Sequence, residues 1–223
     1  MVVSHGPAQI TTIVQAAASS DLVDLPTVKT LLDLQDNGLD TYLKLVITQA
    51  SAAAQGFCNR PFVVETLVDR FWPQRDIYPG ILRGGVAPLQ LTRWPVVAVT
   101  SVVETQSGVP TTLIEGTDYL LDAAEGQLIR LDRNGYPCIW RPVPITVTYS
   151  AGYNPIPPAV VDAVVRLVKG ALMARKRDPM LRSEASPGVY EAAYWFGTGP
   201  GNPGGLPPDV QALLNDFYQP VFA

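Results

Sequence analysis

The stretch ITVTYSAGYNPIPPAVVDAVVRLVKGALMARKRDP, residues 145–179, decides the fold class of this chain. Its first five residues alternate apolar side chains with threonine, which is the period-2 pattern of a half-buried strand. Prolines and a glycine between residues 152 and 158 end that strand, and a proline suits the first turn of a helix. Apolar residues then recur at helical spacing until three cations at 175–177, which favour the negative end of a helix dipole. The stretch predicts a strand followed by a long helix at about 158–177.

Composition excludes several classes of protein. The 223 residues are enough for one sizeable core or for one domain with appendages. Only 16% are charged, while 21 prolines and 18 glycines are present, a balance that suits a chain with much of its surface covered by partners. A net charge of −4 removes the usual electrostatic basis for tight nucleic-acid binding.

Cysteine usage and hydropathy indicate where the chain is made. Cys58 and Cys138 lie far apart, without a CxxC pattern, so they fit a reducing compartment better than a disulfide framework. We find no run of about 18 apolar residues and no basic, apolar leader at the N-terminus. We therefore expect no transmembrane helix, no signal peptide and synthesis in the cytosol.

The N-terminal part reads as an extension followed by helices. Residues 1–25 are mildly apolar, and we expect them to be partly helical from 10 to 18. Asp24 is placed to cap a short helix, and a longer helix follows the turn at 35–38 and ends at 59–61. These two helices predict an N-terminal helical hairpin.

The middle of the chain has a β texture. We expect strands at 62–72, 89–91, 96–104, 119–122 and 127–131, the last two joined as a hairpin across 124–126. Residues 73–87 hold several prolines and glycines and predict a long loop. The strand at 145–149 completes the sheet, and we expect the helix at 158–177 to pack against it. The predicted fold class is α+β, with a connector-like core at 26–182.

After Pro179 the pattern predicts an extended C-terminal arm, residues 183–223. Tyr194, Trp195 and Phe196 form an aromatic cluster before a Gly/Pro-rich linker at 197–205. A short terminal helix follows, whose stripe of Val210, Leu213, Leu214 and Phe217 must dock on its own core or on a neighbour. We give a partner interface slightly more weight, because exposed aromatic residues beside flexible segments mark protein contacts.

The residues offer little for catalysis. His5, the only histidine, falls in the N-terminal extension, and both cysteines read as small packed residues. The acids at 118, 122, 125 and 132 lie around the predicted hairpin, where turn carboxylates are far more often solvated or self-capping than metal-binding. The glycines at 197–205 lack a phosphate-loop pattern. We predict no enzyme, no cofactor and no metal site.

Five segments, taken in order, resemble the head–tail connector proteins (adaptor or head-completion proteins) of tailed bacteriophages. They are VKTLLDLQDNGLDTYLKLVITQASAAAQGFCNRPF (28–62), PLQLTRWPVVAVTSV (88–102), GTDYLLDAAEGQLIRL (116–131), TYSAGYNPIPPAVVDAV (148–164) and LPPDVQALLNDFY (206–218). The resemblance covers roughly residues 26–218. No single segment is stringent, and the ordered series carries the likeness.

The resemblance implies a structural protein of the virion neck. Such proteins form a homo-oligomeric ring, typically of twelve copies, beneath the portal protein, extend the DNA conduit and dock the next neck or tail component. It implies assembly in the host cytoplasm and double-stranded DNA that passes without specific binding. We assign portal or neighbour contacts to Tyr194, Trp195, Phe196, Val210, Leu213, Leu214 and Phe217. We assign contacts to the channel or an adjoining ring to Arg75, Tyr78 and Arg83.

Two other functions stay open. A stopper or tail-terminator protein would be a small β barrel with less helix, and a spectrum dominated by strand would favour it. A hydrolase using the turn carboxylates would lose activity when Asp118 and Asp122 are changed to Asn. For the connector ring, we expect deletion of residues 206–223 to abolish portal binding and leave the core folded.

Overall fold

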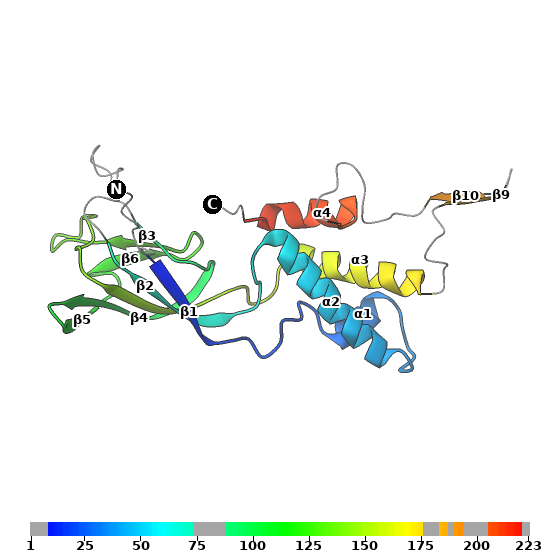
Figure 1. Ribbon diagram of the computed structural model, residues 1–223, viewed down its shortest axis with the longest axis horizontal. Helices are drawn as coiled ribbons and strands as arrows, with labels where there is room; N and C mark the ends of the chain where they lie inside the picture. The colour runs from blue at the N-terminus through cyan, green and yellow to red at the C-terminus, as the bar shows by residue number, and fades with distance from the viewer. Residues whose placement is uncertain (1–8, 74–87, 176–182, 187–189, 194–204, 220–223) are drawn as a thin grey trace, which may run out of the picture. The chain divides into compact units, whose positions relative to one another are not determined.

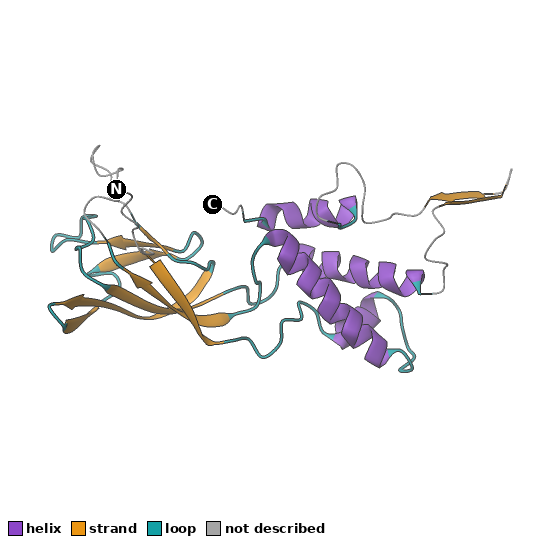
Figure 2. Cartoon of the chain, in the orientation of Figure 1, coloured by secondary structure: helices purple, strands orange, loops and turns teal. Residues whose placement is uncertain are grey.

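The computed structural model describes residues 9–73, 88–175, 183–186, 190–193 and 205–219. The fold is mixed α+β, with helices and antiparallel sheets (Figure 2). The chain divides into two compact units, which we call the β unit (Met1–Ala18 with Val63–Asn154) and the helical unit (Ser19–Phe62 with Pro155–Ala223). Each unit combines segments that are distant in sequence, and the domain boundaries expected at 25 and 182 stay a prediction.

The β unit contains a five-stranded antiparallel sheet (Figure 1). Its strands follow the order β1-β2-β8-β4-β5. Their bounds are β1 Gln9–Gln15, β2 Glu65–Phe71, β8 Ile145–Ala151, β4 Val96–Gln106 and β5 Val109–Leu113. The alternation that predicted a strand at 145–149 is confirmed, since every second residue of β8 from Ile145 to Ala151 is buried.

A second, three-stranded sheet has the order β3-β7-β6, with β3 Leu89–Gln90, β7 Gln127–Arg130 and β6 Tyr119–Asp122. The predicted hairpin across 124–126 is thereby confirmed. One buried apolar cluster draws on both sheets, with Phe71, Leu89, Leu128, Trp140 and Tyr149 among its larger members. Burial of about 1.5–3 kcal/mol per large apolar side chain makes this cluster the main source of stability in the unit.

The expected helix at 10–18 is wrong. Residues 9–15 form β1, which pairs antiparallel with β2 from Gln9↔Phe71 to Gln15↔Thr66. The segment QITTIVQ is rich in β-branched residues, which lose side-chain freedom in a helix and fit a pleated surface. A partner strand far along the chain decides its conformation, so β1 is part of the sheet and no extension.

Gly152 lies where β8 leaves the sheet. Its backbone has φ +139°, and a Cβ at this position would lie only 2.5 Å from the carbonyl oxygen of Val63. No residue with a side chain fits this approach without moving the backbone. The glycine recognised in the sequence as a strand breaker is therefore also a packing requirement.

The helical unit is built from α1 Leu25–Leu31, α2 Asp40–Cys58, α3 Pro158–Ala174 and α4 Pro208–Leu214, followed by the 3-10 turn η2 Asn215–Phe217. Asp24 caps α1 as predicted, since its Oδ1 accepts a hydrogen bond from the Thr27 N–H at 3.0 Å. Asn59 ends α2 in the left-handed conformation, with φ 51°. An ion pair of 2.9 Å joins Lys29 of α1 to Asp40 of α2.

Helix α3 contacts α2 and α4 within the helical unit. Val160, Ala163, Val164 and Val168 are buried on it, and the Tyr42 hydroxyl of α2 donates to the Ala171 carbonyl oxygen at 3.3 Å. Within the helical unit the apolar stripe of α3 packs on α2 and α4, and its packing on the sheet stays a prediction. None of the helices in the described ranges combines the length and hydropathy needed to cross a bilayer.

The C-terminal arm contains a β-hairpin that the sequence did not suggest. Strands β9 Ser183–Ser186 and β10 Tyr190–Ala193 pair antiparallel, from Tyr190↔Ser186 to Ala193↔Ser183. Apart from Tyr190, these short strands consist of serine, alanine and glutamate, which carry little β propensity, and this is why the segment reads as loose chain.

Candidate functional site

The terminal helix docks on its own unit. Val210 is 1% exposed and Leu214 is fully buried, and α4 contacts α3 and α2. These two side chains, assigned above to a partner interface, therefore stabilise the helical unit and offer no free apolar area. Deletion of residues 206–223 should accordingly destabilise this unit, in place of leaving the core folded.

The residues after α4 hold its position against the end of α2. Phe217 and Leu213 are half-buried, and the Phe217 ring meets Phe62 edge-on, with centroids 5.7 Å apart. The Gln219 N–H donates to the Cys58 carbonyl oxygen at 3.0 Å. The exposed parts of Leu213 and Phe217 are what this stripe can still offer to a neighbour.

The other predicted contact residues lie outside the described residues. These are Tyr194, Trp195 and Phe196 of the aromatic cluster, and Arg75, Tyr78 and Arg83 of the long loop. His5 also falls outside them.

The cysteines are not placed for nucleophilic chemistry. Cys58 is buried in the helical unit, where its Sγ contacts the Leu214 carbonyl oxygen at 3.6 Å. Burial raises the pKa of its thiol to about 11, against an opposing effect of Arg60. Burial also raises the pKa of the Cys138 thiol. Because the thiolate is the reactive form, both groups are inert at neutral pH.

The turn carboxylates cap backbone N–H groups, which agrees with the prediction that they are self-capping. The Asp122 Oδ1 accepts from the N–H groups of Ala124 and Glu125, and the Asp132 Oδ1 accepts from those of Asn134 and Tyr136. Within the described ranges, no group of three or more His, Cys, Asp or Glu side chains could hold a metal ion.

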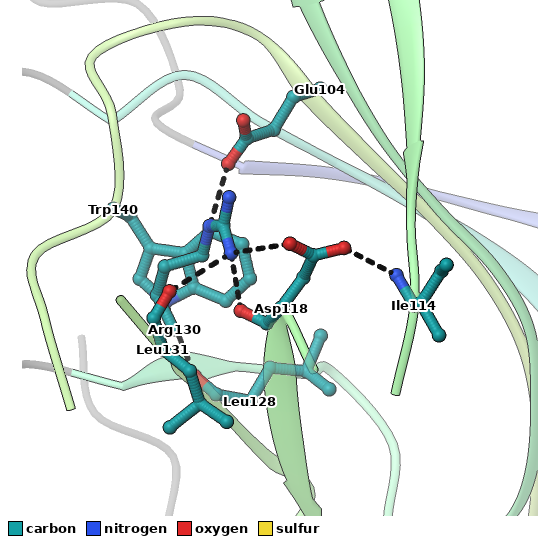
Figure 3. Close-up of polar contacts among 7 residues, drawn as sticks. All are labelled: Glu104, Ile114, Asp118, Leu128, Arg130, Leu131 and Trp140. Atoms are coloured by element: carbon teal, nitrogen blue, oxygen red, sulfur yellow. Dashed lines mark hydrogen bonds and ion pairs between the residues drawn. The ribbon is translucent and has the colours of Figure 1, made fainter. Parts of the chain in front are cut away.

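Arg130 of β7 is the centre of a buried polar cluster (Figure 3). Its Nε donates to the Glu104 carboxylate at 3.1 Å, and its Nη1 lies 3.5 Å from the Asp118 carboxylate. The same Nη1 donates to the backbone oxygens of Asp118 and Leu131. Arg130 is 9% exposed and Glu104 4%, so the guanidinium is compensated almost entirely by protein groups.

The Trp140 ring packs against the Arg130 guanidinium of this cluster. The Arg130 Cζ lies 5.9 Å from the centre of the Trp140 ring, and the indole N–H donates to the Leu128 carbonyl oxygen at 3.2 Å. The cluster ties the segment after β7 to β4 and to the residue before β6. Its role is positional.

A groove of about 640 Å³ opens beside this cluster, and we call it the arginine groove. Its lining includes Asp118, Arg130, Asp132, Arg133, Ile139 and Arg141. Arg133 and Arg141 are exposed, as is Ile139 at 54%. A surface of this kind suits a protein segment with acidic and apolar side chains, because it offers two exposed cations beside an uncovered apolar group.

Sequence reasoning missed this groove. The segment DRNGYPCIWRP, residues 132–142, lies between two predicted strands, and its pattern indicates only a connecting loop. Its signal was the unusual combination of aromatic and aliphatic residues with cations in a turn-rich segment, since exposed loop residues of that kind often carry contacts. Only the fold brings this segment next to Asp118 and Arg130.

A second groove, of about 570 Å³, belongs to the helical unit. Leu31 of α1 and Met173 of α3 line it and are 58% and 64% exposed, and Lys169 and Gly170 of α3 also line it. Uncovered apolar groups of this size beside a helix are typical of surfaces that meet another protein.

Comparison with known proteins places the fold. No protein-family model matches the chain, and a search of curated proteins finds no match. Among solved structures, the chain is similar to one from the neck of an empty GTA particle, computed with C6 symmetry, at a TM-score of 0.53 and 17% identity. It is also similar to a chain from the virion of a native gene transfer agent (GTA) particle, at a TM-score of 0.54 and 17% identity. Both likenesses cover 96% of this chain and 97% of the other.

The likeness therefore concerns the whole chain, with both its units. At this identity it establishes a shared fold. The chain has the fold of a structural chain of a phage-like particle, found in that particle's neck.

Proposed function

We propose that this chain is a structural head-to-tail adaptor of a tailed, phage-like particle. Copies of the chain form a ring beneath the portal protein, extend the DNA channel and dock the next neck or tail component. The observation that carries this proposal is the likeness in fold, over 96% of the chain, to a chain of a GTA neck. An ordered series of five sequence segments that resembles phage connectors supports it independently of the structure.

The chemistry of the described residues agrees with a structural role. Arg130 forms ion pairs with Glu104 and Asp118, and the turn carboxylates cap backbone groups. Surfaces for partners exist instead, in the arginine groove and in the groove of the helical unit. A net charge of −4 lets DNA pass without being held by many phosphate contacts.

The partners follow from this role. The chain binds the portal protein, other copies of itself and the next neck or tail protein, and twelve copies are the number that the connector resemblance implies. The sixfold symmetry given for the GTA neck is compatible with that number. Tyr194, Trp195, Phe196, Arg75, Tyr78 and Arg83 remain proposed contacts on the segments outside the described residues.

Electron microscopy of the purified chain, alone and mixed with the portal protein of its own particle, tests the proposal. We expect a symmetric annulus, at least in the mixture. A chain that stays monomeric with the portal protein and with every candidate neck component would refute the adaptor role.

The arginine groove can be tested in the same mixture. Arg133→Glu combined with Arg141→Glu should weaken docking of one partner while leaving the fold intact, because both side chains are exposed. Lys44→Glu, an exposed cation on α2, is the matched control and should dock normally. Equal docking by all three proteins would remove the groove from the interface.

A further inference from the structure

The two edges of the five-stranded sheet are protected differently. Edge strand β5 contains Pro110, and proline is one of the residues that blunt an edge against further pairing. Edge strand β1, QITTIVQ, contains neither a proline nor a charged residue. Within the described part of the chain, no strand pairs with β1 on the side away from β2. This leaves a row of backbone groups able to accept another strand.

Strand β1 is well suited to receive one. Its pairing with β2 is regular from Gln9 to Ile13, and the register shifts only between Ile13 and Gln15. The Gln9 side chain donates to Thr92 Oγ1 at 2.8 Å and to Asp69 Oδ2 at 3.2 Å, which fixes one end of the strand. Ile10, at 43% exposed, and Val14, at 63%, leave apolar area uncovered.

The β9–β10 hairpin has the opposite deficiency. It consists of two four-residue strands, and no third strand joins it within the described residues. An isolated two-stranded hairpin is at best marginally stable in water and gains stability from a third strand. Its four-residue strands match the regular length of β1 from Gln9 to Ile13.

Charge agrees with this match. Glu184 and Glu191 are the charged residues of the two hairpin strands. Arg70 of β2 is exposed, pairs with Ile10 of β1 and forms no ion pair that involves only described residues. An acidic strand added beside β1 would lie two strand spacings, about 9.5 Å, from β2, so Arg70 offers it a longer-range attraction and no direct cross-strand pair.

We propose that the β9–β10 hairpin of one copy adds to the free edge of β1 in the next copy. Backbone hydrogen bonds supply the contact, as in other cases of strand addition. The contact is heterologous, since the hairpin of one copy and the strand edge of the next are different surfaces. Heterologous contacts generate rings when the rotation between copies closes. This inference rests on the proposed ring and names the interface between its copies.

Two full-length variants test the contact. Ile10→Glu with Thr12→Glu places like charge beside the acidic hairpin, and Ile10→Lys with Thr12→Lys is its control of opposite charge. Ala185→Pro with Ala192→Pro removes backbone donors from the hairpin, and Ala185→Val with Ala192→Val is its strand-favouring control. Circular dichroism establishes that each variant is folded.

Association is then measured by native mass spectrometry, alone and with the portal protein. We expect the self-association of the glutamate and proline variants to be at least about tenfold weaker than that of the unaltered chain and of both controls. In an equimolar mixture of the two defective variants, the proline variant supplies an intact β1 edge and the glutamate variant supplies an intact hairpin. The mixture should form 1:1 pairs that grow no further.

Each other result is decisive. If the unaltered chain forms rings and both defective variants form them equally well, the hairpin contact is overturned. The adaptor role is not affected by that result. Two folded variants that each associate weakly but form no 1:1 pairs when mixed also overturn the contact. An unaltered chain that never assembles with the portal protein overturns the adaptor role itself.

Discussion

The described part of the helical unit fills its interior mainly with alanine, valine and leucine and also buries Arg60, whereas the β unit buries carboxyl side chains as well as an arginine. Asp69, Glu104 and Arg130 are all at most 9% exposed in the β unit, while the described part of the helical unit buries no carboxylate. Helix packing is specified by apolar stripes that fit together at close range. A sheet whose edges and loops must keep one register gains from polar contacts that are satisfied in only one arrangement.

The Asp69 carboxylate illustrates this difference. Its Oδ2 accepts from the Tyr149 hydroxyl at 3.0 Å and from the Thr92 N–H at 2.9 Å, and so joins β2, β8 and the segment after β3. Its Oδ1 is buried and has no hydrogen-bond partner among the residues that the structure describes. Burial, and then the neighbouring Asp69, raises the pKa of Tyr149, which keeps the hydroxyl protonated as a donor.

Two spectroscopic probes separate the units. Three of the four tryptophans, at positions 72, 94 and 140, belong to the β unit, and the long helices belong to the other. Tryptophan fluorescence therefore reports mainly the β unit and far-ultraviolet circular dichroism mainly the helices. Three changes test this difference between the two units.

The largest effect is expected from Arg130→Ala. Removal of the guanidinium leaves Glu104 buried without its partner, which costs about 3–5 kcal/mol of unfolding free energy in the fluorescence transition. Arg133→Ala, an exposed neighbour in the same groove, should stay within about 0.5 kcal/mol. Replacing both partners, with Glu104→Leu and Arg130→Met, should recover most of the loss. Urea denaturation that gives equal values for Arg130→Ala and Arg133→Ala would contradict the role of the buried pair.

Leu214→Ala is the corresponding change in the helical unit. Leu214 is fully buried, so the cavity should cost about 2–5 kcal/mol, seen mainly in the dichroism transition. Asn215→Ala, an exposed neighbour, is the control. A loss seen equally by both probes would mean that the units unfold as one, and no loss would mean that α4 is not docked on this unit.

The smallest effect is expected from alkaline pH. The folded pKa of Cys58 is about 11, above its ordinary value of 9.0, so the folded helical unit holds this proton more strongly than the unfolded chain does. Its contribution is complete below pH 9 and is lost as pH rises towards 11, by about 2–3 kcal/mol in all. Cys58→Ala should remove this slope from the dichroism transition, and a slope that persists in the variant would assign it to other groups.

Local pattern was sufficient where one segment carries its own signal. The strand at 145, the cap at Asp24, the stop at Asn59 and the hairpin around 124–126 all depend on periodicity, capping or turn chemistry within a few residues. Those determinants act over the distance of one turn or one strand pair, so the sequence alone exposes them.

Long-range pairing decided what the pattern could not. β1 is a strand because β2, more than fifty residues later, provides its partner, and the segment at 132–142 became a groove wall because Arg130 holds it beside Asp118. The terminal helix carried an apolar stripe that fitted either a partner or its own unit, and α2 and α3 occupy it first. The residue pattern alone was enough for the elements whose signals are local and for the apolar faces of the helices. Only the tertiary structure decided which faces meet, because that choice depends on the packing of segments that no local pattern connects.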